Sequence, residues 1–405
     1  MSAPARHEVE EGQLLWTPRP EFARGSNVAR YMDWLRRTGR HEAADYDALW
    51  RWSVSDLAGF WSSIWDYFEV RCDTPYTRVL GGSGMLDAEW FEGSRVNYAE
   101  HLLRYEERAA PGETVFHHLS EVRPLQTLSW QELGRQVRIM ATQLRALGVR
   151  PGDCVVSYMP NVPETAIAMM ATTAIGAVWS SAAPEFGVKT VIERFTQIAP
   201  KVLFAADGYV FGGKTFRREA EVRRIVSELP TLERVIWLPY LEPAAPLPDL
   251  PGVLGFGSLM DHPDVPRASF RYERVGHRHP LWVVFSSGTT GLPKPIVHSH
   301  VGVLLEHLKV MHFHINLKPG SVMFFYSTTG WMMWNILLAA LMTGSAVVLY
   351  DGNPAWPEAD FLWELAAATR TTNFGASPTF VQMMEKAGLR PGEKHDLAAL
   401  EGVLV

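Results

Sequence analysis

A short run of hydroxyl-bearing residues and glycines that ends in a lysine is the segment of this sequence with the clearest chemical potential. The run extends from Ser286 to Lys294, reads SSGTTGLPK, and follows the apolar stretch Leu281–Phe285. Its glycines and hydroxyl residues place backbone N–H groups and O–H donors close together, and the lysine adds one positive charge. Many donors, few bulky side chains and one cation are what a polyphosphate ligand requires. A plain Ser/Gly-rich turn is the competing interpretation, but such a turn has no use for the lysine.

The spacing within this run separates it from two common nucleotide-binding motifs. The mononucleotide phosphate loop has four residues between its glycines and places Ser or Thr directly after its lysine. Here Gly288 and Gly291 are three positions apart, and Pro295 follows Lys294. The run also differs from the glycine fingerprint of dinucleotide-binding folds. A phosphate-binding loop of another kind is therefore expected at the end of the strand Leu281–Phe285.

The run from Ser286 to Lys294 closely resembles the phosphate-binding signature of the acyl-adenylate-forming superfamily, which includes the acyl-CoA synthetases. Further segments are similar to the acetyl-CoA synthetase branch of that superfamily: Trp90–Ala99, Gly148–Asp153, Tyr158–Glu164 and Tyr350–Pro357. Within that branch, the segment Thr329–Asn335, which reads TGWMMWN, is most similar to the acetoacetyl-CoA synthetases. The resemblance covers nearly the whole chain.

This resemblance implies an ATP-dependent acid–thiol ligase. In the family, a carboxylate attacks the α-phosphorus of ATP to give an acyl-adenylate and pyrophosphate, and the thiol of coenzyme A then displaces AMP. The implied acid is acetoacetate, and the implied cofactors are ATP, Mg²⁺ and coenzyme A. Residues 286–291 would hold the β- and γ-phosphates, and Lys294 would neutralise charge as pyrophosphate leaves. The expected phosphate-binding residues are Ser286, Ser287, Gly288, Thr289, Thr290, Gly291 and Lys294, with Thr289 and Lys294 as catalytic residues.

The segment Thr329–Asn335 is the candidate for recognition of the acid. It follows an expected strand, Val322–Tyr326, and α/β proteins bind ligands at the carboxyl ends of their parallel strands. The asparagine could offer its amide to a keto oxygen, while its large neighbours shape a slot for the acyl group. The alternative is that all of them only pack the core. The expected substrate-pocket residues are Trp331, Met332, Met333 and Asn335.

The coenzyme A contacts implied by the family are only partly present. Relatives use two arginines for the 3′-phosphate of coenzyme A in the region that corresponds to Asp207–Lys214. Those positions here hold Phe211 and Lys214, so only the second keeps a positive charge. Ala355 also stands where acetyl-CoA synthetases commonly have Asn. Lys214 is therefore either a coenzyme A contact or a plain surface lysine.

Strand-like and helix-like segments alternate along most of the chain, which predicts an α/β fold with parallel-rich sheets flanked by helices. The resemblance implies the large N-terminal domain of an acyl-adenylate-forming enzyme. We expect a Trp-rich helical cap over residues 1–110 and a first α/β subdomain over residues 111–240. A Pro/Gly-rich connection over residues 241–277 then leads to a second, incomplete α/β subdomain over residues 278–405.

Composition sets limits on the function. The chain has 405 residues, 47% of them hydrophobic and 20% charged, which is an ordinary globular composition. A net charge of −6 gives no sign of a nucleic-acid surface. Only two cysteines are present, which favours a reducing cytoplasm, and no metal-ligand pattern is expected among the histidines. Two long uncharged stretches, Thr165–Pro184 and Pro319–Tyr350, are interrupted by Gly, Ser and Thr and are interpreted as buried helix-plus-strand units rather than membrane spans.

The chain stops within the apolar stretch Leu400–Val405, which looks like a strand that is just beginning. The family's adenine-binding segment, acidic metal-binding segment and mobile C-terminal domain would all lie beyond that point. We therefore expect a truncated chain that lacks the C-terminal domain of the same protein and cannot complete adenylation alone. Two alternatives stay open, namely a ligase for another short- or medium-chain acid and a non-catalytic fragment that binds nucleotides.

Overall fold

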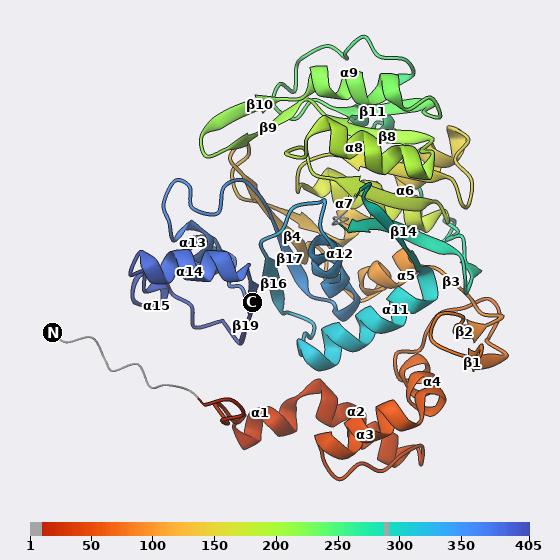
Figure 1. Ribbon diagram of the computed structural model, residues 1–405, viewed down its shortest axis with the longest axis vertical. Coiled ribbons are helices and arrows are strands. Elements are labelled where there is room, and N and C mark those ends of the chain that lie inside the picture. The colour runs from red at the N-terminus through yellow and green to blue at the C-terminus, as the bar shows by residue number, and fades with distance from the viewer. Residues whose placement is uncertain (1–9, 287–290) are drawn as a thin grey trace.

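The computed structural model describes residues 10–286 and 291–405, and two sheets with flanking helices form its core (Figure 1). The first sheet has seven strands in the order β12-β11-β8-β6-β7-β14-β15. Neighbouring strands run parallel except β14 and β15, which form an antiparallel hairpin. In this order the strands are Val253–Gly255, Arg234–Leu238, Val202–Ala206, Cys154–Tyr158, Val178–Ala182, Pro280–Ser286 and Lys294–Ser299.

The second sheet has six strands in the order β19-β18-β16-β17-β4-β5. Here too, all neighbours are parallel except one pair, β4 and β5. In this order the strands are Gly402–Leu404, Asn373–Gly375, Val322–Phe325, Ala346–Asp351, Thr114–Ser120 and Gln126–Ser129. The expected α/β fold with parallel-rich sheets is confirmed, and the apolar end of the chain forms the edge strand β19.

Each sheet takes one hairpin from the stretch of sequence that supplies most of the other sheet. The hairpin of β4 and β5 lies within residues 111–240 but pairs with β17. The hairpin of β14 and β15 lies within residues 278–405 but pairs with β7. The two stretches expected as separate subdomains therefore interleave in space. Their expected boundaries in the sequence do not coincide with the division of the strands between the two sheets.

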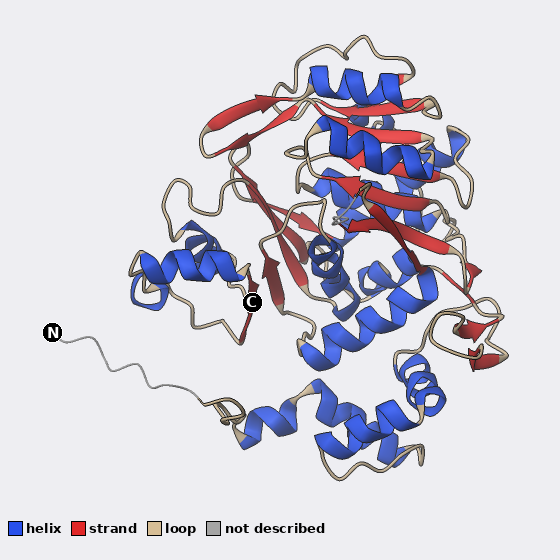
Figure 2. Ribbon diagram, in the orientation of Figure 1, coloured by secondary structure: helices blue, strands red, loops and turns tan. Residues whose placement is uncertain are grey.

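Helices cover both faces of each sheet because successive residues of a buried strand point to opposite sides (Figure 2). In the first sheet, one side packs against α6 (Trp130–Ala146) and α7 (Pro163–Ala174). The other side packs against α8 (Val188–Phe195) and α9 (Glu219–Glu228). In the second sheet, one side packs against α12 (Met332–Ala339), and the other against α13 (Phe361–Ala368) and α14 (Pro378–Lys386).

The two uncharged stretches are buried helix-plus-strand units, as predicted. The first forms α7 and β7, and the second forms β16, α12 and β17. Every residue of α7 except Glu164 is buried. No helix within the described residues is both long and apolar enough to cross a membrane.

The N-terminal segment is mainly helical and lies at one end of the molecule (Figure 1). Its helices are α1 (Pro20–Gly25), α2 (Asn27–Arg37), α3 (Tyr46–Ser55), α4 (Leu57–Tyr67) and α5 (Tyr98–Leu102). Tyr31 of α2 stacks on Phe313, with ring centroids 4.6 Å apart, just beyond α11 (His300–Lys309). Asn27 donates its side-chain amide to the carbonyl of Leu317 at 2.8 Å. These contacts fasten the helical cap to the part of the chain that follows the hairpin of β14 and β15.

Candidate functional site

The candidate phosphate-binding run occupies the turn of the hairpin between β14 and β15. Ser286 ends β14 and pairs with Lys294, which begins β15, and both side chains are exposed. Gly291 has a φ of +125°, a conformation that favours glycine. Ser287, Gly288, Thr289 and Thr290 lie outside the described residues, so their predicted phosphate contacts stay predictions. Ser286, Gly291 and Lys294 are thus brought to one end of the hairpin.

A neighbouring helix contacts both sides of this turn. Gln197, in the 3-10 turn η2 (Thr196–Ile198) after α8, donates a hydrogen bond to the carbonyl of Pro293 at 2.9 Å. Arg194 of α8 lies over the ring of Phe285, the residue before Ser286, with 5.7 Å between guanidinium carbon and ring centroid. The sequence reasoning did not select Arg194, because its proximity to the turn arises only when β7 and β14 pair.

A cavity of about 790 Å³ opens at the carboxyl ends of three adjacent strands, β19, β18 and β16. Its lining includes Tyr326–Thr328 after β16, Ala376–Pro378 after β18 and Val405 after β19. Three of the four predicted substrate-pocket residues, Trp331, Met332 and Met333, line it as well. The segment around Trp331 therefore stands where a ligand of this sheet is expected.

Asn335, the fourth predicted pocket residue, does not line this cavity. It is buried in α12, with 3% of its surface exposed, and its Oδ1 has no hydrogen-bond partner within the described residues. From this helix, Met332, Met333 and Ile336 line the cavity. Its predicted contact with a keto oxygen stays a prediction.

The loop that carries Trp331 is fixed to the seven-stranded sheet. Ser181 of β7 donates its hydroxyl to the carbonyl of Thr329 at 2.5 Å, and Thr329 donates its own hydroxyl to the carbonyl of Met159 at 2.9 Å. The next residue, Gly330, packs so closely on Phe186 that a Cβ would lie 2.6 Å from the ring. Only glycine leaves room for this approach. The loop beside the cavity of one sheet is thereby linked to the segments at the ends of β6 and β7 in the other.

The candidate coenzyme A segment is a two-residue hairpin of β9 (Gly208–Phe211) and β10 (Lys214–Arg217). Gly212 and Gly213 both have positive φ, as this tight turn requires. Their N–H groups donate to the carboxylate of Glu121 at 2.8 and 2.7 Å. Lys214 pairs with Phe211 across the hairpin, and both side chains are exposed. Lys214 is therefore available to a ligand, but no described contact distinguishes it from a surface lysine.

Residues 104–405 match the model of the family described as AMP-binding enzyme. This chain belongs to the AMP-binding enzyme family. Residues 46–102 also match the N-terminus of acetyl-coenzyme A synthetase. The predicted membership of the acyl-adenylate-forming superfamily, in its acetyl-CoA synthetase branch, is confirmed.

Individual relatives agree with this assignment. The chain is 39% identical to acetoacetyl-coenzyme A synthetase of Rhizobium meliloti (strain 1021), over 95% of this chain and 58% of that protein. It is 36% identical to acetoacetyl-CoA synthetase of Rattus norvegicus, over 98% of this chain and 60% of that protein. The solved acetoacetyl-CoA synthetase from Streptomyces lividans superimposes with a TM-score of 0.92 and 44% identity, over 96% of this chain and 59% of that one. The chain thus spans about 60% of the length of these relatives.

One carboxyl group of this AMP-binding enzyme lies half-buried where the two sheets meet. Asp351, at the end of β17, accepts a hydrogen bond from the backbone N–H of Asn161 at 3.1 Å. Its second oxygen, Oδ2, is shielded from solvent and has no partner within the described residues. Burial, together with the nearby carboxyl groups of Glu185 and Glu121, raises the pKa of Asp351 to about 7. Asp351 is therefore poised to change its charge near neutral pH.

The remaining polar residues of this AMP-binding enzyme give no indication of a metal centre. Among the described residues, no group of three or more His, Cys, Asp or Glu side chains could hold a metal ion. The histidines after the phosphate-binding turn serve packing, since His298 accepts a hydrogen bond from the indole N–H of Trp282 at 2.9 Å and His300 is fully buried. Cys72 and Cys154 are both free.

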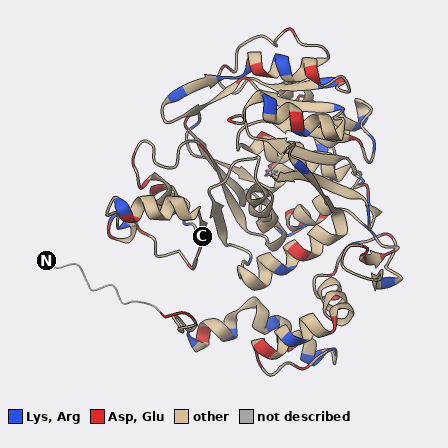
Figure 3. Cartoon of the chain, in the orientation of Figure 1, with Lys and Arg blue, Asp and Glu red and all other residues tan. Residues whose placement is uncertain are grey.

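Basic and acidic residues are mixed along the outer helices (Figure 3).

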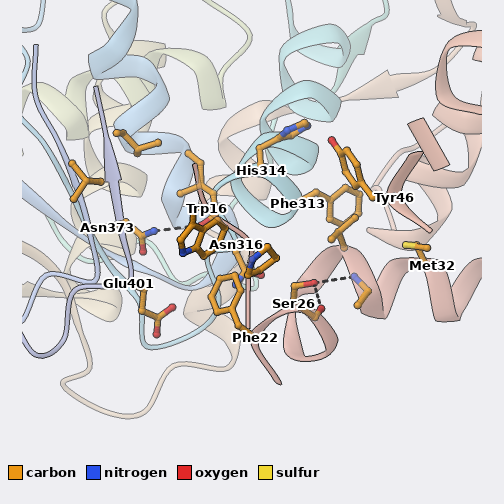
Figure 4. Close-up of a pocket in the computed structure, with 18 residues that line it drawn as sticks. Trp16, Phe22, Ser26, Met32, Tyr46, Phe313, His314, Asn316, Asn373 and Glu401 are labelled. Atoms are coloured by element: carbon orange, nitrogen blue, oxygen red, sulfur yellow. Dashed lines mark hydrogen bonds between the residues drawn. The ribbon is translucent and has the colours of Figure 1, made fainter. Parts of the chain in front are cut away.

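A second cavity, of about 640 Å³, lies between the N-terminal helices and the edge of the six-stranded sheet (Figure 4). Trp16, Phe22 and Phe313 contribute rings to its lining, and Glu401 and Asn373 lie on its other side. None of the predicted site residues lines it. His314, Ile315 and Leu404 line both this cavity and the one beside Trp331, so the two cavities adjoin.

Proposed function

We propose that this chain provides the polyphosphate- and acid-binding surfaces of an ATP-dependent acetoacetate–CoA ligase. The reaction joins acetoacetate to ATP, giving acetoacetyl-adenylate and pyrophosphate, and then transfers the acyl group to coenzyme A with release of AMP. The observation that carries the proposal is the cavity lined by Trp331, Met332 and Met333, which the contacts of Thr329 and Gly330 hold beside the phosphate-binding turn. An acid and a nucleotide must lie side by side for adenylation. The contacts that Thr329 and Gly330 make with the seven-stranded sheet, here called the joint between the sheets, support that placement.

In the proposed reaction, the chain acts mainly through binding and charge, because phosphoryl chemistry of this kind depends on positioning and electrostatic stabilisation. Lys294 neutralises the negative charge that develops on the departing pyrophosphate, and Ser286 donates its hydroxyl to a phosphate oxygen. The apolar wall of Met332 and Met333 excludes water from the acid and holds its short chain. Mg²⁺ supplies counter-charge when bound. The described residues offer it no cluster of three or more His, Cys, Asp or Glu side chains.

The coenzyme A contact is proposed for Lys214 at the hairpin of β9 and β10. A cavity of about 340 Å³ lies beside this hairpin, lined in part by Gly213, Tyr350 and Trp356. An exposed lysine next to a hollow suits a phosphate group as a point charge. A cytoplasmic location and the participation of a further C-terminal domain also belong to the proposal, the latter because the chain spans about 60% of its relatives.

The test is pyrophosphate release from ATP and Mg²⁺ with a panel of short acids, with and without coenzyme A. It is run on this chain and on the full-length gene product in parallel. Preferred turnover of acetoacetate by the full-length product supports the proposal and identifies the Trp331 segment as the selectivity element. Preferred turnover of another acid would support the ligase reaction but rule out acetoacetate as the preferred substrate. Absence of turnover with every acid favours the non-catalytic alternative, and robust acyl-CoA formation by this chain alone refutes the need for a further domain.

A further inference from the structure

Among the described residues, the side chain of Arg194 has no ion-pair partner, and it lies beside the turn of β14 and β15. Its guanidinium carbon lies 4.7 Å from the ring centroid of Phe186 and 5.7 Å from that of Phe285. Within the described residues it makes no hydrogen bond and no ion pair, and its Nε is shielded from solvent without a partner. Its neighbour Glu193 pairs instead with Lys189. Two aromatic faces therefore hold the guanidinium in place, and no anion from the described part of the chain neutralises it.

Such an arrangement is unfavourable for the protein alone. Burial lowers the pKa of Arg194, which means that its surroundings disfavour the positive charge. A shielded N–H group without an acceptor adds a further cost. Most other partly buried arginines of this chain have carboxylate partners, as Arg138 has in Glu106 at 2.8 Å and Arg123 has in Glu164 at 2.8 Å. An anion that comes from outside the protein would satisfy Arg194.

The residues around Arg194 indicate which external anion it could bind. Phe285, one of the two rings beneath it, directly precedes Ser286, and Gln197 from the following turn of chain holds the carbonyl of Pro293, directly before Lys294. Both flanks of the phosphate-binding turn thus contact the segment of α8 and η2. The other ring, Phe186, lies against Gly330 at the start of the acid cavity. The guanidinium thus contacts one ring next to the turn and one ring next to Gly330.

We propose that Arg194 binds the same polyphosphate as Lys294 and serves as its second cation. This inference rests on the proposed nucleotide-binding function of the turn. A guanidinium presents a planar fork of donors that matches two phosphate oxygens, and it keeps its charge even when partly buried. The stacking on Phe186 and Phe285 fixes that fork before the ligand arrives, which lowers the entropic cost of binding. Lys294, on an exposed strand end, supplies a mobile charge, and Arg194 supplies a fixed one.

A structural role is the competing interpretation, in which Arg194 merely packs on two aromatic rings. The experiment that separates the two interpretations measures binding of magnesium tripolyphosphate to this chain by isothermal titration calorimetry. Tripolyphosphate has no base, no sugar and no carboxylate, so its binding does not depend on the acid or on coenzyme A. The test variants are Arg194→Met, which keeps the apolar packing without the charge, and Arg194→Lys, which keeps the charge without the fork. Lys189→Met is the matched control, because it removes an exposed cation from the same helix.

We expect Arg194→Met to weaken tripolyphosphate binding about tenfold or more, the effect of losing charged hydrogen bonds. We expect Arg194→Lys to recover part of that loss and Lys189→Met to stay within about twofold of the unsubstituted chain. Arg194→Met should also flatten the dependence of affinity on salt, since one fewer cation contacts the ligand. Thermal unfolding of each variant checks that it is folded. If Arg194→Met is unfolded, the tripolyphosphate affinity of Arg194→Lys and the salt dependence of that affinity decide between the two interpretations.

Unchanged affinity and salt dependence in Arg194→Met overturn the inference, as does the absence of tripolyphosphate binding by the unsubstituted chain. A failure of the proposed ligase function is a different result. If no acid supports pyrophosphate release but tripolyphosphate binding still depends on Arg194, the inference stands and the ligase assignment falls.

Discussion

Replacing Asp351 by Asn should change the pH dependence of folding stability in a defined window. The carboxyl group is shielded at the junction of the two sheets, and its pKa of about 7 in the folded protein compares with a usual value of 3.8. A group whose pKa is raised on folding stabilises the protein most below its unfolded pKa, and this stabilisation disappears as the pH rises through the folded pKa. The window for Asp351 is therefore about pH 4 to pH 7.

The magnitude follows from the size of the shift. Each pKa unit corresponds to about 1.4 kcal/mol, so a shift from 3.8 to about 7 amounts to roughly 4 kcal/mol across the whole window. Between pH 5 and pH 7, the unsubstituted protein should lose about 2 kcal/mol of unfolding free energy relative to Asp351→Asn. Asn keeps the acceptor for the backbone N–H of Asn161 and cannot ionise. The variant should thus become relatively more stable as the pH rises.

Urea unfolding of both proteins at pH 5, 6, 7 and 8 measures this difference. Both proteins carry the same histidines and other carboxyl groups. The difference between their unfolding free energies at each pH therefore isolates the contribution of Asp351. Asp33→Asn is the control, since Asp33 is an exposed residue whose pKa is lowered by Arg37 and Arg36 and whose pH effect has the opposite sign. A difference between native protein and Asp351→Asn that stays constant from pH 5 to pH 8 would falsify the argument from burial.

Four further predictions concern the site and its frame. Lys294→Met should lower pyrophosphate release by the full-length product about 10²-fold or more, measured with saturating acid, because it removes charge from the leaving group. Lys214→Ala should raise the KM for coenzyme A several-fold and leave pyrophosphate release without coenzyme A unchanged, a split that an ordinary surface lysine would not produce. Gly330→Ala should cost about 1–3 kcal/mol in urea unfolding and raise the KM for the acid, since a Cβ would meet the ring of Phe186 at 2.6 Å. His300, whose pKa burial lowers to about 3, stabilises the protein above pH 6.5, and His300→Asn should reduce by about 2 kcal/mol the stability lost between pH 7 and pH 5.

The strand expected at Leu281–Phe285 is present because the run is densely apolar, and it forms most of β14 (Pro280–Ser286). Strand β4 (Thr114–Ser120) was not recognised, since its two central histidines interrupt the apolar pattern. The hairpin of β9 and β10 was also missed, although the pair Gly212 and Gly213 between short strand-like runs is a usual turn signal.

The candidate site was predictable where it follows from a local run and not where it depends on packing between distant segments. The phosphate-binding turn and the cavity residues Trp331, Met332 and Met333 each belong to one short segment whose composition is unusual. Arg194 lies about ninety residues before the turn and meets it only through pairing of β7 with β14. The hydrogen bond to Asp351 likewise comes from a distant residue, Asn161, which follows β6 of the other sheet. Such contacts have no signature in the local sequence.

Under the proposed function, the contacts that link the two sheets bring these distant residues into one mechanism. Ser181 and Thr329 link β7 to the loop after β16, and Gly330 and Phe186 bring the two backbones together one residue later. On one side of this joint lies the acid cavity, and on the other lie Arg194 and the turn of β14 and β15. Attack of a carboxylate on a phosphorus requires the two reactants to be held in line within a few ångströms. A rigid joint meets that requirement, because it fixes the distance between two sites that are built on separate sheets.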